Sequence, residues 1–398
     1  MVPWAYEANV DAEITETKMS LNSLATELVL QVFRSCTSIA DVLNLSLTCR
    51  RFHQALAGSQ RLAILAHAAE VEYGPMKDIV QLVTQNASQP AHLIREAPMS
   101  LNLLQQVVEV GRVAKKWEEI YPLKKWKINF EDRRLLTDVE RWCLRRAIYR
   151  LWLYCRAFHS PLYPRTSRLA PPIVRERAEL LHNWTTTELA EIEDTRLVVR
   201  DVVQNHICPS NSTIQRKFHK RYPDHQHPLL FNVHLHPPPL AYSHFAAAGR
   251  ESCSPPDPET EPFSTFPNKI HRDDRPVTHI VAPSNKYATK FRLDLYHEPG
   301  LEGWGDDIPH YYVVEDMLKL DPGQVIWLRE NAHLKQQVEQ YVRGLGDWFD
   351  NNGETFGQTV DWVLSERGED IVAFRDGLVD GELGVARNMR TYSACSLS

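Results

Sequence analysis

The sequence predicts a mostly α-helical protein, and three observations carry this prediction. Apolar residues recur at helical spacing through the first half of the chain and again beyond residue 310. Helix start signals stand at Thr185–Thr187 and at Asp321-Pro322. No internal repeat appears at periods of about 20 to 50 residues, which disfavours solenoids and propellers. We expect a short three-helix region near the N-terminus, followed by an irregular multi-helix body with a long proline-rich connection.

Length and composition are those of a folded protein that is not secreted. With 398 residues, 43% of them hydrophobic, the chain can form two or three domains with buried cores. No apolar run approaches the roughly 18 residues that span a bilayer, and residues 1–17 are acidic, unlike a signal peptide. The seven cysteines are scattered and form no C-x-x-C pair, which indicates reduced thiols. We therefore predict a cytoplasmic or nuclear protein without a membrane partner.

The net charge of −6 is unevenly distributed along the chain. Residues 112–168 contain 15 Lys and Arg against 6 Asp and Glu, whereas residues 298–382 contain 6 against 19. These stretches either lie against each other or are solvated separately; alternatively, the basic one binds an acidic partner or nucleic acid. No zinc-finger or RNA-binding motif accompanies the basic stretch, so nucleic acid is the less favoured partner.

Periodicity places the expected elements. Helices are expected over residues 24–34, 59–70, 75–84, 100–117, 132–157, 185–206, 311–320, 323–342 and 355–366. In 132–157 a wide stripe that includes Leu135, Val139 and Trp142 favours a core helix over a ligand groove. The expected organisation is a flexible N-terminus (1–19), the three-helix region (20–58), a first helical part (59–210), the connection (211–290), an acidic second helical part (291–386) and a flexible tail (387–398).

The expected connection is dense in proline and histidine. Residues 223–283 hold 12 of the 25 prolines, which excludes long helices and central strands there. Two H-x-H pairs among its histidines could supply four nitrogens to zinc. Because Pro237–Pro239 interrupts directly, exposed polar side chains are the favoured interpretation, and a metal-dependent enzyme remains a third hypothesis. The histidines are His219, His225, His227, His234, His236 and His244.

Catalytic motifs are missing from the sequence. It contains no G-x-S-x-G, no H-E-x-x-H and no G-x-x-x-x-G-K-(S/T). Gly344-Leu-Gly346 lacks the third glycine of a dinucleotide fingerprint and follows a helix rather than a strand. We predict no catalytic residues, no cofactor, no metal and no enzyme activity.

The segment Leu24–Phe52 is the most informative part of the chain. Its first helix carries a narrow apolar strip of Leu24, Leu28 and Val32 beside Phe33. Ser38-Ile-Ala-Asp41 has the form of a capping box, which predicts a second helix, and a third begins near Thr48 or Cys49. Three such short helices have too little interior to bury all their leucines. Part of this apolar surface is therefore expected to contact a partner.

This segment resembles an F-box. The F-box pattern is Leu-Pro-x-Glu-(Leu/Ile), then (Ile/Val)-Phe, then Asp-(Leu/Val), and a closing (Cys/Ser)-(Arg/Lys)-x-(Phe/Trp). Two positions depart from it: Ala25 stands where proline is expected, and Cys36 where leucine is usual. The remainder, with its Trp-Gly-Asp-Asp and Trp-Phe-Asp-Asn-Asn-Gly stretches, is similar to F-box proteins of filamentous fungi. The residues that match are Leu24, Glu27, Leu28, Val32, Phe33, Asp41, Val42, Leu45, Cys49, Arg50 and Phe52.

The resemblance implies an adaptor of an SCF ubiquitin ligase. Such a chain docks on the Skp adaptor subunit, and through it on a cullin, while its remainder holds a protein substrate for ubiquitylation. The alternative is an F-box-like scaffold outside a ligase, which Ala25 supports. The residues assigned to the Skp contact are Leu24, Ala25, Glu27, Leu28, Val32, Phe33, Val42, Leu43, Leu45, Leu47, Cys49 and Phe52.

The substrate-binding residues stay unassigned. Four tryptophans of the acidic part are candidates, although core packing is the more common use of each. A basic patch could read phosphate through charge-assisted bonds, although solvated lysines are the default. These residues are Trp304, Trp327, Trp348 and Trp362 for the first group, and Lys115, Lys116, Lys124, Lys125 and Lys127 for the second.

Overall fold

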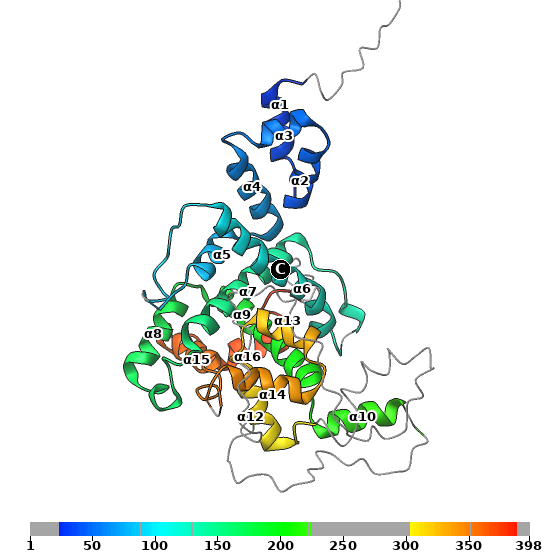
Figure 1. The fold of residues 1–398 in the computed structure, drawn as a ribbon. Coiled ribbons are helices and arrows are strands. Elements are labelled where there is room, and N and C mark those ends of the chain that lie inside the picture. Colours follow the sequence, from blue (N-terminus) through cyan, green and yellow to red (C-terminus); the bar gives the residue numbers. More distant parts are fainter. Residues whose placement is uncertain are drawn as a thin grey trace, which may run out of the picture. The chain divides into compact units, whose positions relative to one another are not determined.

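The computed structural model describes residues 24–87, 89–128, 130–221, 223, 303–350 and 352–387. These residues form α-helices joined by turns and short 3-10 or π segments, and none of them is in a strand (Figure 1). The predicted mostly α-helical fold is confirmed. The expected flexible N-terminus, most of the connection and the tail from residue 388 lie outside the described residues.

The described chain divides into two compact units. The first unit comprises residues up to 72 together with 99–101, and the second comprises residues 73–98 and those from 102 onward. The first unit extends beyond the three-helix region predicted to end at residue 58, because a fourth helix belongs to the same unit. This helix buries Ile64, Leu65 and Ala68, and its Glu72 accepts a 3.0 Å hydrogen bond from the backbone N–H of Ile39.

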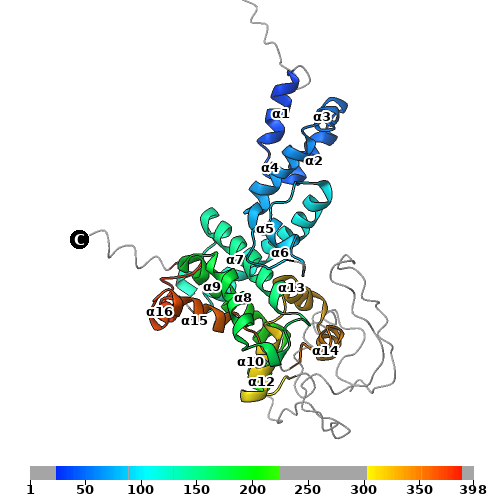
Figure 2. The ribbon, with the colours of Figure 1, turned by 90° about the vertical axis from the view of Figure 1, so that its left-hand side faces the viewer.

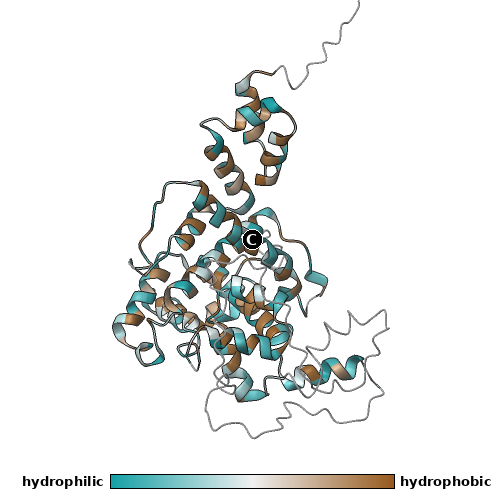
Figure 3. Ribbon diagram, in the orientation of Figure 1, coloured by the Kyte–Doolittle hydropathy of each residue, from teal (hydrophilic) through white to brown (hydrophobic). Residues whose placement is uncertain are grey.

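The first unit consists of four short helices: α1 (Thr26–Arg34), α2 (Ile39–Leu47), α3 (Arg50–Leu56) and α4 (Arg61–Tyr73, of which Tyr73 belongs to the second unit). Local signals fix where they begin. The Ser38 hydroxyl accepts a hydrogen bond from the backbone N–H of Asp41, so the predicted start of α2 is confirmed. The third helix begins after Cys49, as predicted. Hydrophobic and hydrophilic residues alternate along α1 to α3 (Figure 3).

The second unit begins with α5 (Met76–Val83), α6 (Leu101–Lys125, whose first residue belongs to the first unit), α7 (Asp138–Phe158), α8 (Pro171–His182), α9 (Thr186–Val202), a π-helix (Val203–Ile207) and α10 (Asn211–Arg221). Capping boxes start α7 at Thr137 with Glu140 and α9 at Thr185 with Glu188. Helices α7 and α9 lie side by side (Figures 1 and 2). The expected helix at 185–206 is thereby confirmed, with a π-helical last turn.

The acidic part of the second unit contains α12 (Asp307–Met317), α13 (Pro322–Asn331), α14 (Lys335–Gly344), α15 (Phe356–Glu366) and α16 (Ile371–Val379). Asp321 caps α13, with Pro322 in the first turn as predicted. The prediction of a single helix over 323–342 is wrong, because the backbone leaves the helical conformation at Ala332 and a new helix begins after Leu334. Helix α15 lies against α8.

Three further expectations are corrected. The helix expected from residue 132 begins at Asp138, because the capping box of Thr137 sets its start. Leu135, Val139 and Trp142 are exposed rather than in the core, since the buried face of α7 begins at Leu144. The connection expected from residue 211 opens with helix α10, and α8 and α16 were not predicted. In the part of the chain described, no helix is long and apolar enough to cross a membrane.

Candidate protein-docking site

Four apolar side chains on two helices of the first unit are exposed. Leu28 and Val32 lie one turn apart on α1, and Leu43 and Leu47 lie one turn apart on α2. Their exposed fractions are 51%, 38%, 41% and 77%. We refer to these four residues as the docking surface. Four large aliphatic side chains that lie open on two short helices are typical of a surface that another polypeptide covers.

Three of the residues assigned to the Skp contact lie inside the unit instead. Phe33, Val42 and Phe52 are almost fully buried, and the rings of Phe33 and Phe52 meet edge to face with centroids 6.1 Å apart. In this structure these three side chains are inside the unit and are not accessible to a partner. They hold α1, α2 and α3 together, and so position the docking surface.

The other assigned residues frame the docking surface. Ala25 and Glu27 are exposed, whereas Leu24, Leu45 and Cys49 are half-buried. The Leu24 carbonyl accepts a hydrogen bond from the Arg51 guanidinium, which ties the chain before α1 to α3. The expected contribution of Leu24, Leu45 and Cys49 to a partner is thus smaller than that of the four open side chains.

The two departures from the F-box pattern have local consequences. Ala25 is the N-cap of α1, and its carbonyl accepts hydrogen bonds from the N–H groups of Leu28 and Val29 at 3.1 and 3.2 Å. Its φ of −60° is the value that proline adopts, so alanine here keeps the geometry without the ring. Cys36 is half-buried, and its thiol donates to the Val32 carbonyl at 3.5 Å.

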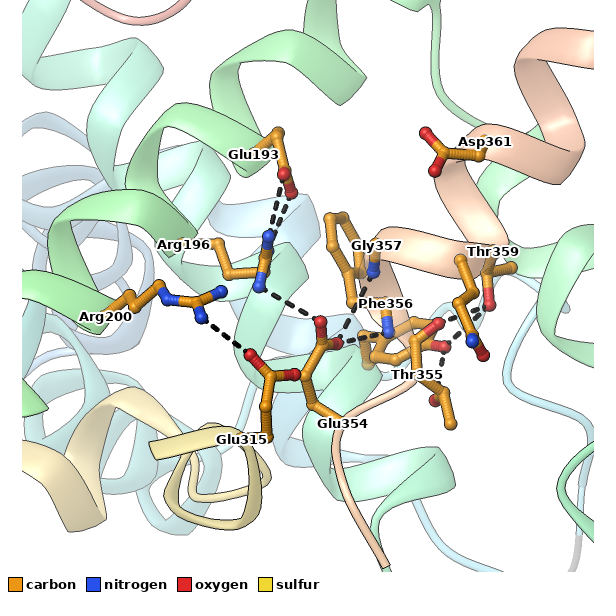
Figure 4. Close-up of polar contacts among 12 residues, drawn as sticks. Glu193, Arg196, Arg200, Glu315, Glu354, Thr355, Phe356, Gly357, Thr359 and Asp361 are labelled. Atoms are coloured by element: carbon orange, nitrogen blue, oxygen red, sulfur yellow. Dashed lines mark hydrogen bonds and ion pairs between the residues drawn. The ribbon is translucent and has the colours of Figure 1, made fainter. Parts of the chain in front are cut away.

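The second unit contains a buried network of ion pairs that the sequence analysis missed. Arg196 on α9 pairs with Glu193 at 2.7 Å and with Glu354, next to α15, at 3.0 Å (Figure 4). Arg375 on α16 makes a further ion pair with Glu193. The backbone N–H of Phe356 donates to Glu354 at 2.5 Å. The network therefore joins α9, α15 and α16 through charged groups that are buried, apart from the partly exposed Arg375.

The pKa shifts of Glu193 and Arg196 indicate that the network has a structural role. Burial alone would raise the pKa of Glu193, but Arg196 and Arg375 hold it at about 2. Burial disfavours the charged form of Arg196, yet Glu193 and Glu354 raise its pKa. Glu193 is therefore a fixed anion that does not exchange protons near neutral pH. The only sequence signal was that Glu191 and Glu193–Arg196, five of six consecutive residues, are polar.

A buried lysine is also structural. The ammonium group of Lys319 lies 3.1 Å from Asp316 and 4.2 Å from the centroid of the Phe349 ring, and it donates to the Phe349 carbonyl. Burial lowers its pKa to about 8 against the opposing effect of Asp316. Lys319 and Asp316 are enclosed, which excludes substrate access to this pair. The pair anchors the loop before α15, because Asp316 also accepts a 2.7 Å hydrogen bond from the Gly353 N–H.

The basic stretch 112–168 pairs largely with carboxylates of α9. Lys125 lies 2.7 Å from Asp194, and Arg146 lies 2.6 Å from Glu191. One pair, Lys116 with Glu330 at 2.6 Å, joins the basic and acidic stretches. The basic stretch is therefore compensated mainly by carboxylates of α9, and contact with the acidic stretch contributes only a part.

The candidate substrate and metal residues are dispersed. Trp304 and Trp327 are buried, and Trp348 is half-buried. Trp362 is exposed and lines a surface cavity of about 330 Å³ between α8 and α15. His219 is exposed on α10, whereas the other five histidines of the proposed metal cluster lie outside the described residues. Within the described ranges, no group of three or more His, Cys, Asp or Glu side chains could hold a metal ion.

Comparison of the chain with protein-family models, with curated proteins and with solved structures yields no significant match. The function must therefore be inferred from the chain itself. The basis for this inference is the F-box-like segment and the apolar surface that its first two helices leave open.

Proposed function

We propose that the chain is a substrate-recognition adaptor of an SCF ubiquitin ligase, docked through α1–α3 on the Skp subunit. The single observation that carries the proposal is the exposure of Leu28, Val32, Leu43 and Leu47 on a unit whose interior is already filled by Phe33, Val42 and Phe52. The core of the unit is filled without these four exposed aliphatic side chains, so they remain available to a partner. Their positions coincide with, or lie between, the residues of the F-box-like pattern.

The physical basis of docking is burial of apolar surface. Covering a Leu or Val side chain stabilises a complex by about 1.5–3 kcal/mol when burial is complete. Each of the four partly exposed side chains supplies a fraction of this free energy. Together they form the apolar centre of an interface, which a polar rim surrounds. Glu27 is exposed at the start of α1 and belongs to that rim. The second unit is assigned to the protein substrate.

The test compares matched substitutions of exposed apolar residues in the same unit. Leu28→Asp and Leu43→Asp place a charge on the docking surface and are expected to abolish co-elution with a purified Skp subunit. Val71→Asp is the control, because Val71 is 45% exposed on α4, outside the F-box-like segment of the sequence. Retention of the Skp subunit by both docking-surface variants, or equal loss in the control, would contradict the proposal.

A scaffold that uses the same surface outside a ligase is the second candidate. Ala25 favours it, because proline in the first turn of an F-box helix is absent here. The two candidates differ in what accompanies the Skp subunit. Purification of the full chain from cells distinguishes them, since a ligase adaptor brings a cullin with it, whereas a scaffold brings the Skp subunit alone or another partner.

A further inference from the structure

A cluster of basic side chains lies in the second unit, where the end of α6 meets the end of α9. The ammonium nitrogen of Lys124 lies 2.6 Å from one carboxylate oxygen of Asp201, and that of Lys127 lies 3.0 Å from the other. Lys124 Nζ is also 2.7 Å from Nε2 of His206. Two lysines thus share a single carboxylate, and His206 lies against one of them.

The π-helix brings a third lysine to the same place. The Asn205 carbonyl would be the helical partner of the N–H at position 209, but Pro209 has none. The Asn205 carbonyl accepts a 2.9 Å hydrogen bond from Lys217 Nζ of α10 instead, and the Asn205 amide donates to Asp201 Oδ1 at 2.9 Å. Single-turn π segments are rare and occur often at functional sites.

Positive charge exceeds negative charge in this cluster. Lys124 and Lys127 pair with Asp201, Lys217 reaches the same place through Asn205, and Arg329 of α13 acts on Lys124 and His206. The cluster therefore carries more positive than negative charge. Lys124 and Asp201 are mostly buried, so water screens this excess only in part.

The titration behaviour of the cluster reflects this excess. Burial, followed by Lys124, Lys217 and Arg329, lowers the pKa of His206 to about 3. Partial burial, together with Lys124 and Lys127, lowers the pKa of Lys217, and Arg216 adds to the effect against the opposing Asp201. Burial also lowers the pKa of Lys124, and Lys127 and Arg329 contribute against Asp201. Charged groups that disfavour one another in this way are stabilised by an added anion.

We propose that this cluster, formed by Lys124, Lys127, Lys217 and Arg329 around Asp201 and His206, binds a phosphate group. A phosphate dianion matches the excess charge, and its oxygens accept charge-assisted hydrogen bonds from several ammonium and guanidinium groups at once. His206, whose Nε2 lies 2.7 Å from Lys124 Nζ, is the imidazole of the cluster. The site is independent of the docking surface. Inorganic phosphate and a phosphorylated serine side chain supply the same chemistry.

The binding test uses the full-length protein and isothermal titration with inorganic phosphate, with sodium chloride of equal ionic strength as the reference. The double variant Lys217→Gln/Arg329→Gln is expected to bind at least about tenfold more weakly, because two charge-assisted contacts are lost. Neither side chain belongs to the buried core. Lys116→Gln is the control, since Lys116 is an exposed lysine of α6 that pairs with Glu330. It is expected to bind like the wild type.

A variant of opposite sign sharpens the test. Asp201→Asn removes the competing carboxylate and is expected to tighten phosphate binding, whereas a lysine cluster with a purely structural role gains no affinity from it. Bound phosphate is expected to raise the pKa of His206 by favouring the imidazolium form, which NMR of the imidazole ring measures.

A second titration identifies the source of the phosphate. Binding of a phosphoserine peptide that is tighter than binding of inorganic phosphate assigns a modified protein as the ligand, and weaker binding assigns the free ion. Either result supports the site. Phosphate binding that chloride reproduces, or that survives undiminished in the double variant, would overturn the proposal.

Discussion

The ring of Phe33 on α1 meets the ring of Phe52 on α3 edge to face, with their centroids 6.1 Å apart. Both residues were expected at the surface of the F-box-like segment, and both are buried. This pair joins the first helix to the third across the interior of the first unit. The docking surface therefore depends on the pair for its shape, although neither ring belongs to it.

Truncation of this pair should unfold the first unit locally. Phe52→Ala is expected to destabilise the unit by about 3–5 kcal/mol, because it removes a buried ring and leaves a cavity in a small core. Hydrogen exchange of the amides in residues 26–56, followed by mass spectrometry, locates the effect. Leu28→Ala serves as the control and is expected to change exchange little, since exposed side chains contribute within about 0.5 kcal/mol. Equal protection in the two variants would show that the ring pair does not hold the helices.

Restoring the proline of the F-box pattern should be tolerated. The φ of Ala25 is −60°, within the range of proline, and its N–H makes no hydrogen bond among the described residues. Ala25→Pro is expected to stabilise the first unit by about 0.4–1 kcal/mol by restricting the unfolded chain. Urea unfolding measures this change. Titration with the Skp subunit shows whether the affinity of the chain for that subunit also rises, as expected if proline contacts it. Thr26→Pro, one position later, is the matched control.

The segment after α16 needs glycine at position 384. Its φ is +109°, and an added Cβ would lie 2.5 Å from a carboxylate oxygen of Asp194. That carboxylate also accepts hydrogen bonds from the Tyr121 hydroxyl and from the Val385 N–H. Gly384→Ala is expected to cost at least about 2 kcal/mol through backbone strain and displacement of Asp194. Thermal unfolding provides the measurement.

Gly368 provides the comparison for this substitution. Its φ is +72°, but nothing lies within 4 Å of an added Cβ. Gly368→Ala therefore reports only the backbone conformation, with an expected cost of about 1 kcal/mol. If the two alanine variants are equally stable, the contact with Asp194 is not important to the fold.

Acid should weaken the ion-pair network of the second unit. The pKa of Glu193 is about 2 in the folded chain, against an ordinary value of 4.5. Its pairing therefore stabilises the fold above pH 4.5, and this contribution is lost as the pH falls from 4.5 toward 2; its size is on the order of 3 kcal/mol. Glu193→Gln is expected to be less stable at pH 7 and to lose less stability than the wild type between pH 5 and 3. Urea unfolding at several pH values checks both.

Glu366→Gln is the control for the pH experiment. Glu366 is an exposed carboxylate that pairs with His182 at 2.8 Å. It lies on the surface, where ion pairs contribute little to stability. We expect its pH profile to follow that of the wild type. A Glu193→Gln profile that also follows the wild type would assign the acid sensitivity to other groups.

The helical class and the starts of several helices follow from the amino-acid sequence alone. Ser38, Thr185 and Asp321 cap α2, α9 and α13 at the predicted positions. These starts were predictable because a cap is a hydrogen bond between residues two or three positions apart, which depends on local residues alone. The F-box-like segment was visible for a similar reason, since its residues follow one another at fixed spacing.

Only the tertiary structure decided which side of each helix is covered. Periodicity assigned Val32 and Phe33 to the same apolar face, yet Val32 is exposed and Phe33 is buried. The helix break at Ala332 was likewise not visible in the apolar pattern. The basic cluster joins Lys124 to Lys217, residues far apart in the chain, through Asp201 and Asn205. Burial and charge balance arise from contacts between distant segments, and a local pattern contains no information on which segments meet.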